Sequence, residues 1–176
     1  VETIAASSTF AGGAAITLAN ISTTANRLNI GAANTGALTV NFPTGSNTLS
    51  NPFALPANAF TVTAAGTSTT DSLTILNGAT TGVDNLAGRA LTFTGFETIT
   101  LNGTTTATQA QTVGAIGVSA TATSGLTSQA VTVNYAGNNQ ITSGAVASSS
   151  SGLLTIDASS MTGSNASLQM GTAAPT

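Results

Sequence analysis

Short segments in which apolar residues alternate with threonine recur along the whole chain. They are ITL at 16–18, LTV at 38–40, VTA at 62–64, LTI at 73–75, LTF at 91–93, ITL at 99–101, VTV at 131–133 and LTI at 154–156. Alternation with a period of two is typical of a β-strand that buries one of its faces. Stretches such as NTG, NGA, TSG and AGNN separate the segments and favour turns, because Gly and Asn tolerate a positive φ. The pattern predicts an all-β protein with many short strands.

The same pattern leaves little room for helices, since no window places large apolar residues at i, i+3 and i+4. Residues 42–56, FPTGSNTLSNPFALP, hold three of the four prolines. Because proline lacks the N–H that a central strand needs, this stretch predicts a long excursion or a boundary between two lobes. We otherwise expect a single β-rich domain over residues 1–176.

One internal repeat bears on how the strands are arranged. The segment ILNGATT at 75–81 aligns with TLNGTTT at 100–106, at an offset of 25 residues. That offset suits one coil of a parallel β-solenoid, in which equivalent positions of successive coils stack on one another. Many short strands of similar spacing are also typical of a β-sandwich. The sequence therefore favours a parallel β-solenoid and leaves a β-sandwich as the alternative.

The composition narrows the range of partners. Only 4% of the residues are charged, against roughly 25% in an average soluble domain. Arg27 and Arg89 are the only cations and the net charge is −3, which argues against nucleic acid and anionic membranes because both require clustered Lys or Arg. No apolar run approaches the roughly 18 residues of a membrane span. Near-neutral surfaces lack electrostatic repulsion, so we expect a homo-oligomer or polymer.

The residues that usually carry catalysis are missing. The chain has no His, Cys or Lys, so its many serines lack an ordinary base to activate them as nucleophiles. A pair of carboxylates could in principle hydrolyse a glycoside, and Asp71, Asp84 and Glu97 recur at 13-residue intervals. Acids at strand entrances more commonly accept hydrogen bonds from nearby backbone N–H groups. We therefore expect no enzymatic activity.

The same acids form the pool from which a calcium site could be built. Calcium binds six to eight oxygens from carboxylates, amides, carbonyls and water. The candidate ligands are Asp71, Asp84, Glu97 and Asp157, together with the neighbouring amides Asn77, Asn85 and Asn102. So few acids limit the chain to one or two sites, and calcium is the only cofactor that the sequence supports.

Two local motifs point to a known class of protein. They are D-x-L-T-I followed by L-T-F-x-G-F-E-x-I-T-L within residues 71–103, and LLTIDASSMTG at 153–163. These blocks resemble the strand-repeat regions of secreted bacterial surface proteins, namely S-layer proteins and RTX-type exoproteins. The resemblance implies a β-solenoid or β-rich fold, export to the cell surface, calcium-stabilised assembly and no catalysis. The tandem G-G-x-G-x-D signature of RTX repeats is missing, because FAGGAA at 10–15 has the glycines without the aspartate.

Thr-x-Thr triplets occur at 61–63, 67–69, 98–100, 106–108 and 121–123. Such triplets resemble the threonine ladders of ice-binding solenoids, which require stacking in register on one exposed face. Their spacing along the chain is irregular, so we interpret them as ordinary outward-facing strand residues.

These observations predict a structural, self-assembling extracellular subunit of a cell-surface layer, sheath or filament. Monomeric β-proteins protect their sheet edges with Lys, other charges or Pro, and this chain largely omits that protection. The segments VETIAASSTF at 1–10 and SLQMGT at 167–172 are the candidate edge strands. The alternative is a binding module, either an adhesin or an ice-binding type.

Overall fold

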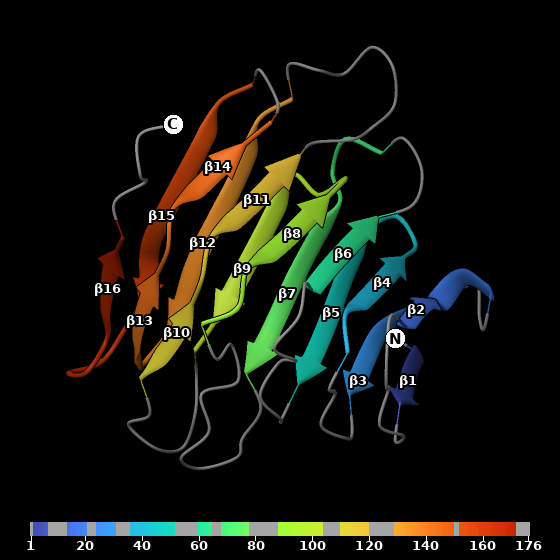
Figure 1. Ribbon diagram of the computed structural model, residues 1–176, viewed down its shortest axis with the longest axis horizontal. Helices are drawn as coiled ribbons and strands as arrows, with labels where there is room; N and C mark the ends of the chain where they lie inside the picture. The colour runs from blue at the N-terminus through green and yellow to red at the C-terminus, as the bar shows by residue number, and fades with distance from the viewer. Residues whose placement is uncertain are drawn as a thin grey trace.

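The computed structural model describes residues 2–6, 14–20, 24–30, 36–51, 60–64, 68–77, 88–103, 110–119, 129–149 and 152–171. Most of these residues lie in β-strands, and their one helical element is the 3-10 turn η1 (Leu18–Asn20). None of the described elements is a helix that is long and apolar enough to cross a membrane. The paired strands all run parallel and wind into a β-solenoid (Figure 1). This confirms the all-β, parallel β-solenoid prediction over the β-sandwich.

The described strands form three sheets. The seven-stranded sheet contains, in spatial order, β1 (Glu2–Ala6), β3 (Ala25–Ile30), β5 (Ser46–Asn51), β7 (Ser72–Asn77), β9 (Thr98–Asn102), β12 (Val131–Gly137) and β15 (Leu154–Met161). The six-stranded sheet contains β2 (Ala14–Thr17), β4 (Leu38–Phe42), β6 (Phe60–Ala64), β8 (Leu91–Thr94), β11 (Ile116–Ser119) and β14 (Val146–Ser148). The three-stranded sheet contains β10 (Gln111–Val113), β13 (Gln140–Ser143) and β16 (Ser167–Met170).

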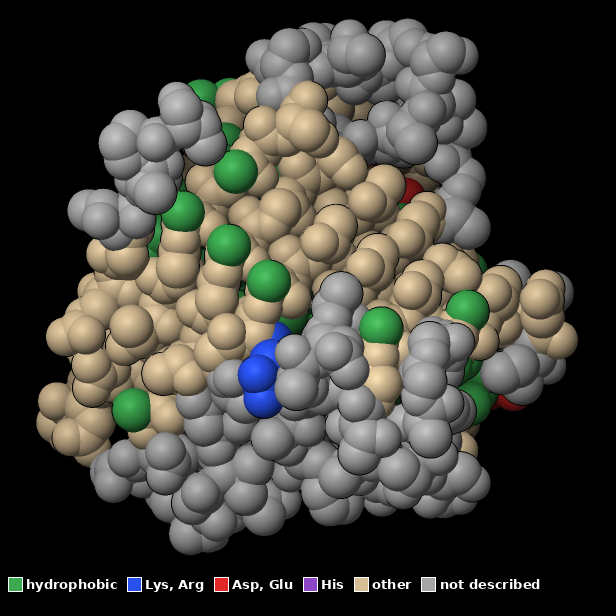
Figure 2. All heavy atoms as spheres, viewed as in Figure 1, with side chains coloured by type: hydrophobic (Ala, Val, Ile, Leu, Met, Phe, Trp, Pro, Cys, Tyr) green, Lys and Arg blue, Asp and Glu red, His purple; other side chains and the backbone are tan. Residues whose placement is uncertain are grey.

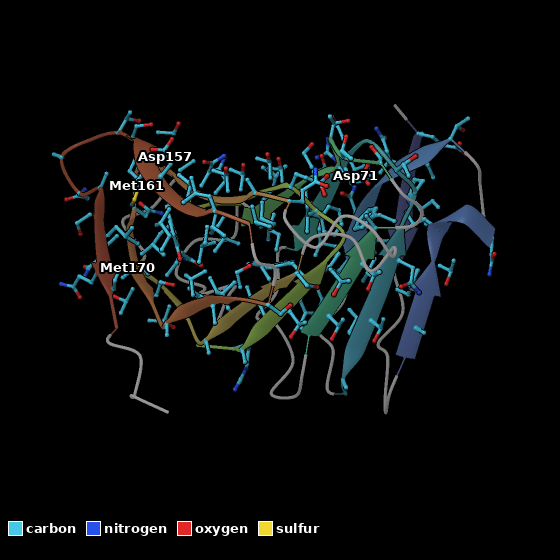
Figure 3. The ribbon with its side chains drawn as sticks, turned by 90° about the horizontal axis from the view of Figure 1, so that it is seen from above. Asp71, Asp157, Met161 and Met170 are labelled. Carbon is cyan, nitrogen blue, oxygen red and sulfur yellow. The ribbon has the colours of Figure 1, made fainter. Side chains whose placement is uncertain are left out.

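The cross-section of the solenoid changes along its axis. From β1 to β9 the chain alternates between the seven-stranded and six-stranded sheets. From β10 onward each circuit of the chain, here called a coil, adds a strand of the three-stranded sheet. Figure 3 shows the two large sheets as facing layers, with the dark red β16 standing across the gap at the C-terminal end. The early coils are therefore two-sided and the late coils three-sided.

Alternation along each strand decides which side chains enter the core. In β6, Phe60 and Val62 are buried, whereas Thr61 and Thr63 point outward. Parallel pairing then stacks inward residues of successive coils into columns, because strands of neighbouring coils lie about 4.8 Å apart. The largest buried side chains include Tyr135, Phe42, Phe60, Phe93 and Phe96. One apolar core therefore runs through the described coils.

The register between β7 and β9 differs from the one that the LNG repeat predicts. That repeat aligns Asn77 with Asn102, whereas in the structure Leu76 pairs with Asn102. The coil spans 26 residues here. A slip of one residue would turn every side chain of the strand to the opposite face. Ile75 and Leu101 are both buried, so their burial fixes the register and the polar repeat does not.

The proline-rich stretch is partly contained in the stack. Residues 42–51 include the end of β4 and all of β5, and β5 pairs with β3 on one side and β7 on the other. Residues 52–56 lie outside the described residues.

Candidate functional site

Asp71 and Glu97 occupy the same corner of successive coils, immediately before β7 and β9. The Asp71 Oδ1 atom accepts a hydrogen bond from the backbone N–H of Gly45 at 2.5 Å. The Glu97 Oε2 atom accepts one from the backbone N–H of Asp71 at 2.7 Å. Each carboxylate thus satisfies a backbone donor of the preceding coil, just before the strand begins. We call this pair the carboxylate corner.

Both carboxyl groups of the carboxylate corner are buried and only half satisfied. Asp71 is 1% and Glu97 9% exposed, yet Asp71 Oδ2 and Glu97 Oε1 have no hydrogen-bond partner. Burial raises the pKa of Glu97 above its ordinary value of 4.5, and the neighbouring Asp71 carboxylate adds to the increase. Two acidic groups therefore share a poorly solvated place, where ionised oxygens are costly.

A third unpartnered oxygen lies in the same part of the structure. Asn47 is 2% exposed, and its Nδ2 donates to the carbonyls of Pro43 at 2.9 Å and Gly45 at 3.0 Å. Its Oδ1 has no partner. Because Gly45 is also the residue whose N–H bonds to Asp71, the Asn47 amide, near the start of β5, holds the turn that adjoins the carboxylate corner. Asn47 is not among the ligands that the sequence predicts, since a single Asn near the start of a strand carries no distinctive signal.

Asp157 does not join the carboxylate corner. It lies on β15, where its Oδ1 accepts a hydrogen bond from the Ser159 backbone N–H at 2.8 Å. This hydrogen bond lowers the pKa of Asp157. Figure 3 shows Asp157 far along the solenoid from Asp71. The Asp157 side chain therefore supports an irregular strand near the C-terminal end, where the pairing of β12 and β15 shifts.

The remaining candidates of the calcium pool are separated from the carboxylate corner or lie outside the described residues. Asn77 ends β7 and Asn102 ends β9, so both stand at the opposite ends of the strands that Asp71 and Glu97 precede. Asp84 and Asn85 lie outside the described residues. Within the described ranges, no three acidic, His or Cys side chains gather as a metal-binding group.

A second feature is the last coil, whose apolar side chains reach solvent. β14, β15 and β16 are each the last strand of their sheet among the described residues. Ile156 stacks on the buried Val133 but is 43% exposed, and Met170 stacks on the buried Ser143 but is 41% exposed. Leu153, just before β15, is 72% exposed. We call Leu153, Ile156 and Met170 the C-terminal end face; Figure 3 shows Met170 at this extremity of the solenoid.

The N-terminal end of the solenoid resembles the C-terminal end in sequence, but fewer sheets present an open strand edge there. β1 and β2 are the first strands of the two large sheets. β1 contains TIAA at 3–6 and β15 contains TIDA at 155–158. In both strands the isoleucine points inward, since Ile4 pairs with Leu28 and Ile156 with Val133. Among the described strands, the three-stranded sheet begins at β10, so it offers no described edge at the N-terminal end.

A third feature covers the outward face of the six-stranded sheet. Two neighbouring columns of polar side chains run across its strands; the first contains Thr39, Thr61 and Thr92, and the second Thr17, Asn41, Thr63, Thr94 and Ser119. Within the second column, Asn41 donates to Thr17 at 3.1 Å and Ser119 to Thr94 at 3.2 Å. Figure 2 looks onto this face, and its described part shows little red or blue. The face is an ordered, nearly uncharged array of hydroxyl groups.

The first column ends in a shallow hollow. Gly117 and Ala147 continue the column beyond Thr92, and because their side chains are small they leave a depression lined also by Ser119 and Ser148. The hollow faces outward and has no titratable side chain in its lining.

The seven-stranded sheet carries a less uniform array. Its outward columns contain Ser46, Ser72, Thr98, Thr132 and Thr155 in one, and Arg27, Thr48, Thr74, Thr100, Asn134 and Asp157 in the other. Arg27 and Asp157 place charges within the second column. The triplets at 61–63 and 98–100 therefore lie on different sheets, while 106–108 and 121–123 lie outside the described residues.

The sequence motif does not reveal which triplets stack in register, because the segments that stack on the Thr-x-Thr triplets are not all Thr-x-Thr themselves. The triplet at 61–63 stacks on Thr39-Val40-Asn41, and the triplet at 98–100 stacks on Ser72-Leu73-Thr74. Asn and Ser preserve the polar column but break the literal motif.

Searches against protein-family models, curated proteins and solved structures find no match to this chain.

Proposed function

We propose that this protein is a structural, self-assembling subunit of an extracellular surface layer, sheath or filament, and that its solenoids stack end to end. The observation that carries the proposal is the C-terminal end face. Ile156 and Met170 are exposed although they stack on the buried Val133 and Ser143, and the neighbouring inward side chains of the last described coil, Leu154 and Leu168, are only partly buried. Unpaired strand edges and exposed apolar side chains together favour association with another strand-bearing surface.

A second copy of the same chain is the occupant that fits best. The matching segments at 3–6 and 155–158 would place threonine beside threonine and isoleucine beside isoleucine if β1 of one copy paired with β15 of another. Ile4 would then cover Ile156 and extend the inward apolar column. β2 and β14 supply the corresponding edges of the six-stranded sheet. The low charge of the chain leaves little electrostatic repulsion between copies.

The head-to-tail arrangement also predicts which exposed side chains of the C-terminal end face a second copy would cover. Within the described part of the chain, β16 has no counterpart at the N-terminal end, because the three-stranded sheet begins at β10 there. Such a stack covers Ile156 and leaves the β16 edge with Met170 open. The two exposed side chains therefore serve as a matched pair in mutagenesis.

The decisive experiment compares the native chain with Ile156→Lys, using sedimentation velocity over a range of concentrations and negative-stain electron microscopy. We expect the native chain to form rod-like oligomers that lengthen with concentration. Ile156→Lys should remain monomeric, because a charge would have to be buried at the junction. Thr92→Lys, on the outward face of the six-stranded sheet, and Met170→Lys should both assemble.

Circular dichroism establishes that each variant is folded before its assembly is judged. A native chain that stays monomeric at every concentration would disprove the proposal. Assembly of Ile156→Lys as readily as the native chain would remove the end face from the interface. The experiment is run in calcium and in chelator so that any ionic requirement is recorded separately.

The hydroxyl columns of the six-stranded sheet favour a second candidate, a binding module of the ice-binding type. Strand spacing of about 4.8 Å, and about 6.6 Å between outward residues of one strand, set the hydroxyl groups in a two-dimensional lattice. Such a lattice of hydroxyl groups can hold ordered water. An adhesin site for a charged ligand would not require ordered water, so the lattice favours the ice-binding type. Ice affinity partitioning of the native chain tests this function. Retention in ice that Thr61→Lys abolishes and Thr74→Lys leaves intact would support it, and exclusion of the native chain from ice would refute it.

A further inference from the structure

Asp71 and Glu97 are buried acids, and each has one oxygen without a partner among the described residues. Burying such oxygens in ionised form raises the free energy of the folded state. Ionised carboxylates deprived of water are unfavourable unless they are hydrogen-bonded and neutralised. Asp71 and Glu97 each satisfy one oxygen with a backbone N–H, whereas Asp71 Oδ2 and Glu97 Oε1 have no partner. A ligand that supplies positive charge to these oxygens would remove the cost.

We propose that the carboxylate corner, with the Asn47 amide beside it, binds a divalent hard cation, with calcium as the ion it fits. The unpartnered atoms are carboxylate and amide oxygens from three successive coils, Asn47 Oδ1, Asp71 Oδ2 and Glu97 Oε1. All three residues are at least nine-tenths buried. Calcium takes such oxygens readily and completes its coordination with backbone carbonyls and water.

The backbone at this corner already holds the carboxylates in place. The N–H of Gly45 fixes Asp71, and the N–H of Asp71 fixes Glu97. Each of these hydrogen bonds uses one oxygen of its carboxylate and leaves the other oxygen without a protein partner. A site with only two carboxylates is expected to be weak, in the range of about 10⁻⁴ to 10⁻³ M that is typical of extracellular modules.

This cation would join coils of one chain and would not join copies. The carboxylate corner lies between β5, β7 and β9, in the middle of the seven-stranded sheet, whereas the proposed junction lies at β15. Cation binding and self-assembly are therefore separate properties. A chain can fail the assembly test and still bind calcium, and the reverse also holds.

Isothermal titration calorimetry with CaCl₂ at neutral pH tests the site, together with thermal unfolding in CaCl₂ and in chelator. We expect the native chain to bind one Ca²⁺ and to melt at a higher temperature in calcium, since a ligand that binds only the folded state stabilises it. Glu97→Gln keeps the acceptor for the Asp71 N–H and removes one ligand charge. It should fold and bind calcium at least tenfold more weakly.

Asp157→Asn provides the matched control, because Asp157 is a partly exposed carboxylate on β15 with its own backbone partner. Its calcium affinity and calcium-induced melting shift should equal those of the native chain. Three results would each overturn the site: no heat and no melting shift in the native chain, an undiminished response in Glu97→Gln, or loss of the response in Asp157→Asn.

Discussion

Glu97 accepts a hydrogen bond from the backbone N–H of Asp71 at 2.7 Å, although the two residues are 26 positions apart in the sequence. Asp71 in turn accepts one from Gly45 in the coil before. The chain has five acids in 176 residues, and two of them lie stacked at this buried corner. These acids therefore contribute to the coil-to-coil connection and little to the surface charge.

The first prediction separates the hydrogen bond of Glu97 from its charge. Glu97→Ala leaves the buried Asp71 N–H without a partner, which should lower the free energy of unfolding by about 1–3 kcal/mol. Glu97→Gln keeps an acceptor of similar shape, so in chelator it should be at least as stable as the native chain. Urea denaturation in chelator measures both variants. Equal destabilisation by Ala and Gln would contradict this account.

The second prediction concerns pH. Because burial raises the pKa of Glu97 in the folded chain, the folded state binds the Glu97 proton more tightly than the unfolded state does. The resulting stability is fully present below the ordinary pKa of 4.5 and is lost as the pH rises through the raised value. In chelator, the urea midpoint should therefore increase as the pH is lowered from neutral toward 4.5.

Glu97→Gln serves as the control for pH and should remove this increase. Asp157 acts in the opposite direction at lower pH. Its pKa is lowered, so the stability it contributes is present above 3.8 and is lost as the pH falls through the lowered value. A native chain whose midpoint falls steadily between neutral pH and 4.5, with no difference from Glu97→Gln, would refute the assignment.

The third prediction concerns a column of glycines where coils come close together. A Cβ on Gly144 would lie 2.7 Å from the backbone of Gly114, and one on Gly114 would lie 2.7 Å from the carbonyl oxygen of Gly88. Gly144→Ala should therefore destabilise the chain by about 1–3 kcal/mol through overpacking. Gly117→Ala is the control, since the nearest atom to its Cβ is Thr92 Oγ1 at 4.0 Å.

Alanine at Gly117 should leave the free energy of unfolding unchanged or raise it by up to about 1 kcal/mol, because it restricts the unfolded chain. Thermal and urea unfolding of the two alanine variants measure the difference. A Gly144→Ala variant as stable as Gly117→Ala would show that the coils can move apart at this position without cost.

The fourth prediction uses the buried hydrogen bond between the Tyr135 hydroxyl and Ser143 Oγ, at 2.7 Å. Ser143 Oγ also donates to the Gly144 carbonyl at 3.1 Å. Tyr135→Phe therefore leaves Ser143 with a partner and should cost about 1 kcal/mol. Ser143→Ala leaves the buried Tyr135 hydroxyl unsatisfied and should cost about 1–3 kcal/mol. Urea denaturation that ranks the two variants in the reverse order would contradict this reasoning.

Much of the fold is readable from local pattern, and the carboxylate corner is readable in part. Apolar–Thr–apolar alternation predicts strands because a strand buries every second side chain. The positions of Asp71 and Glu97 at the entrances of two of these strands are also readable from the sequence. Asn77 and Asn102 are also among the calcium ligands that the sequence predicts, but they stand at the opposite ends of β7 and β9. Asn47 was missed because its proximity to the acids arises only from coil stacking.

Strand content and scarcity of charge follow from the composition and from a period of two, and the 25-residue repeat favours a parallel β-solenoid. The register of the strands is set only when the coils stack. The LNG repeat aligns Asn77 with Asn102, but burial of Ile75 and Leu101 pairs Leu76 with Asn102 instead. Register depends on which side chains fill a shared interior, and that interior exists only once distant coils have stacked. The carboxylate corner, the hydroxyl columns and the C-terminal end face all follow from that stacking.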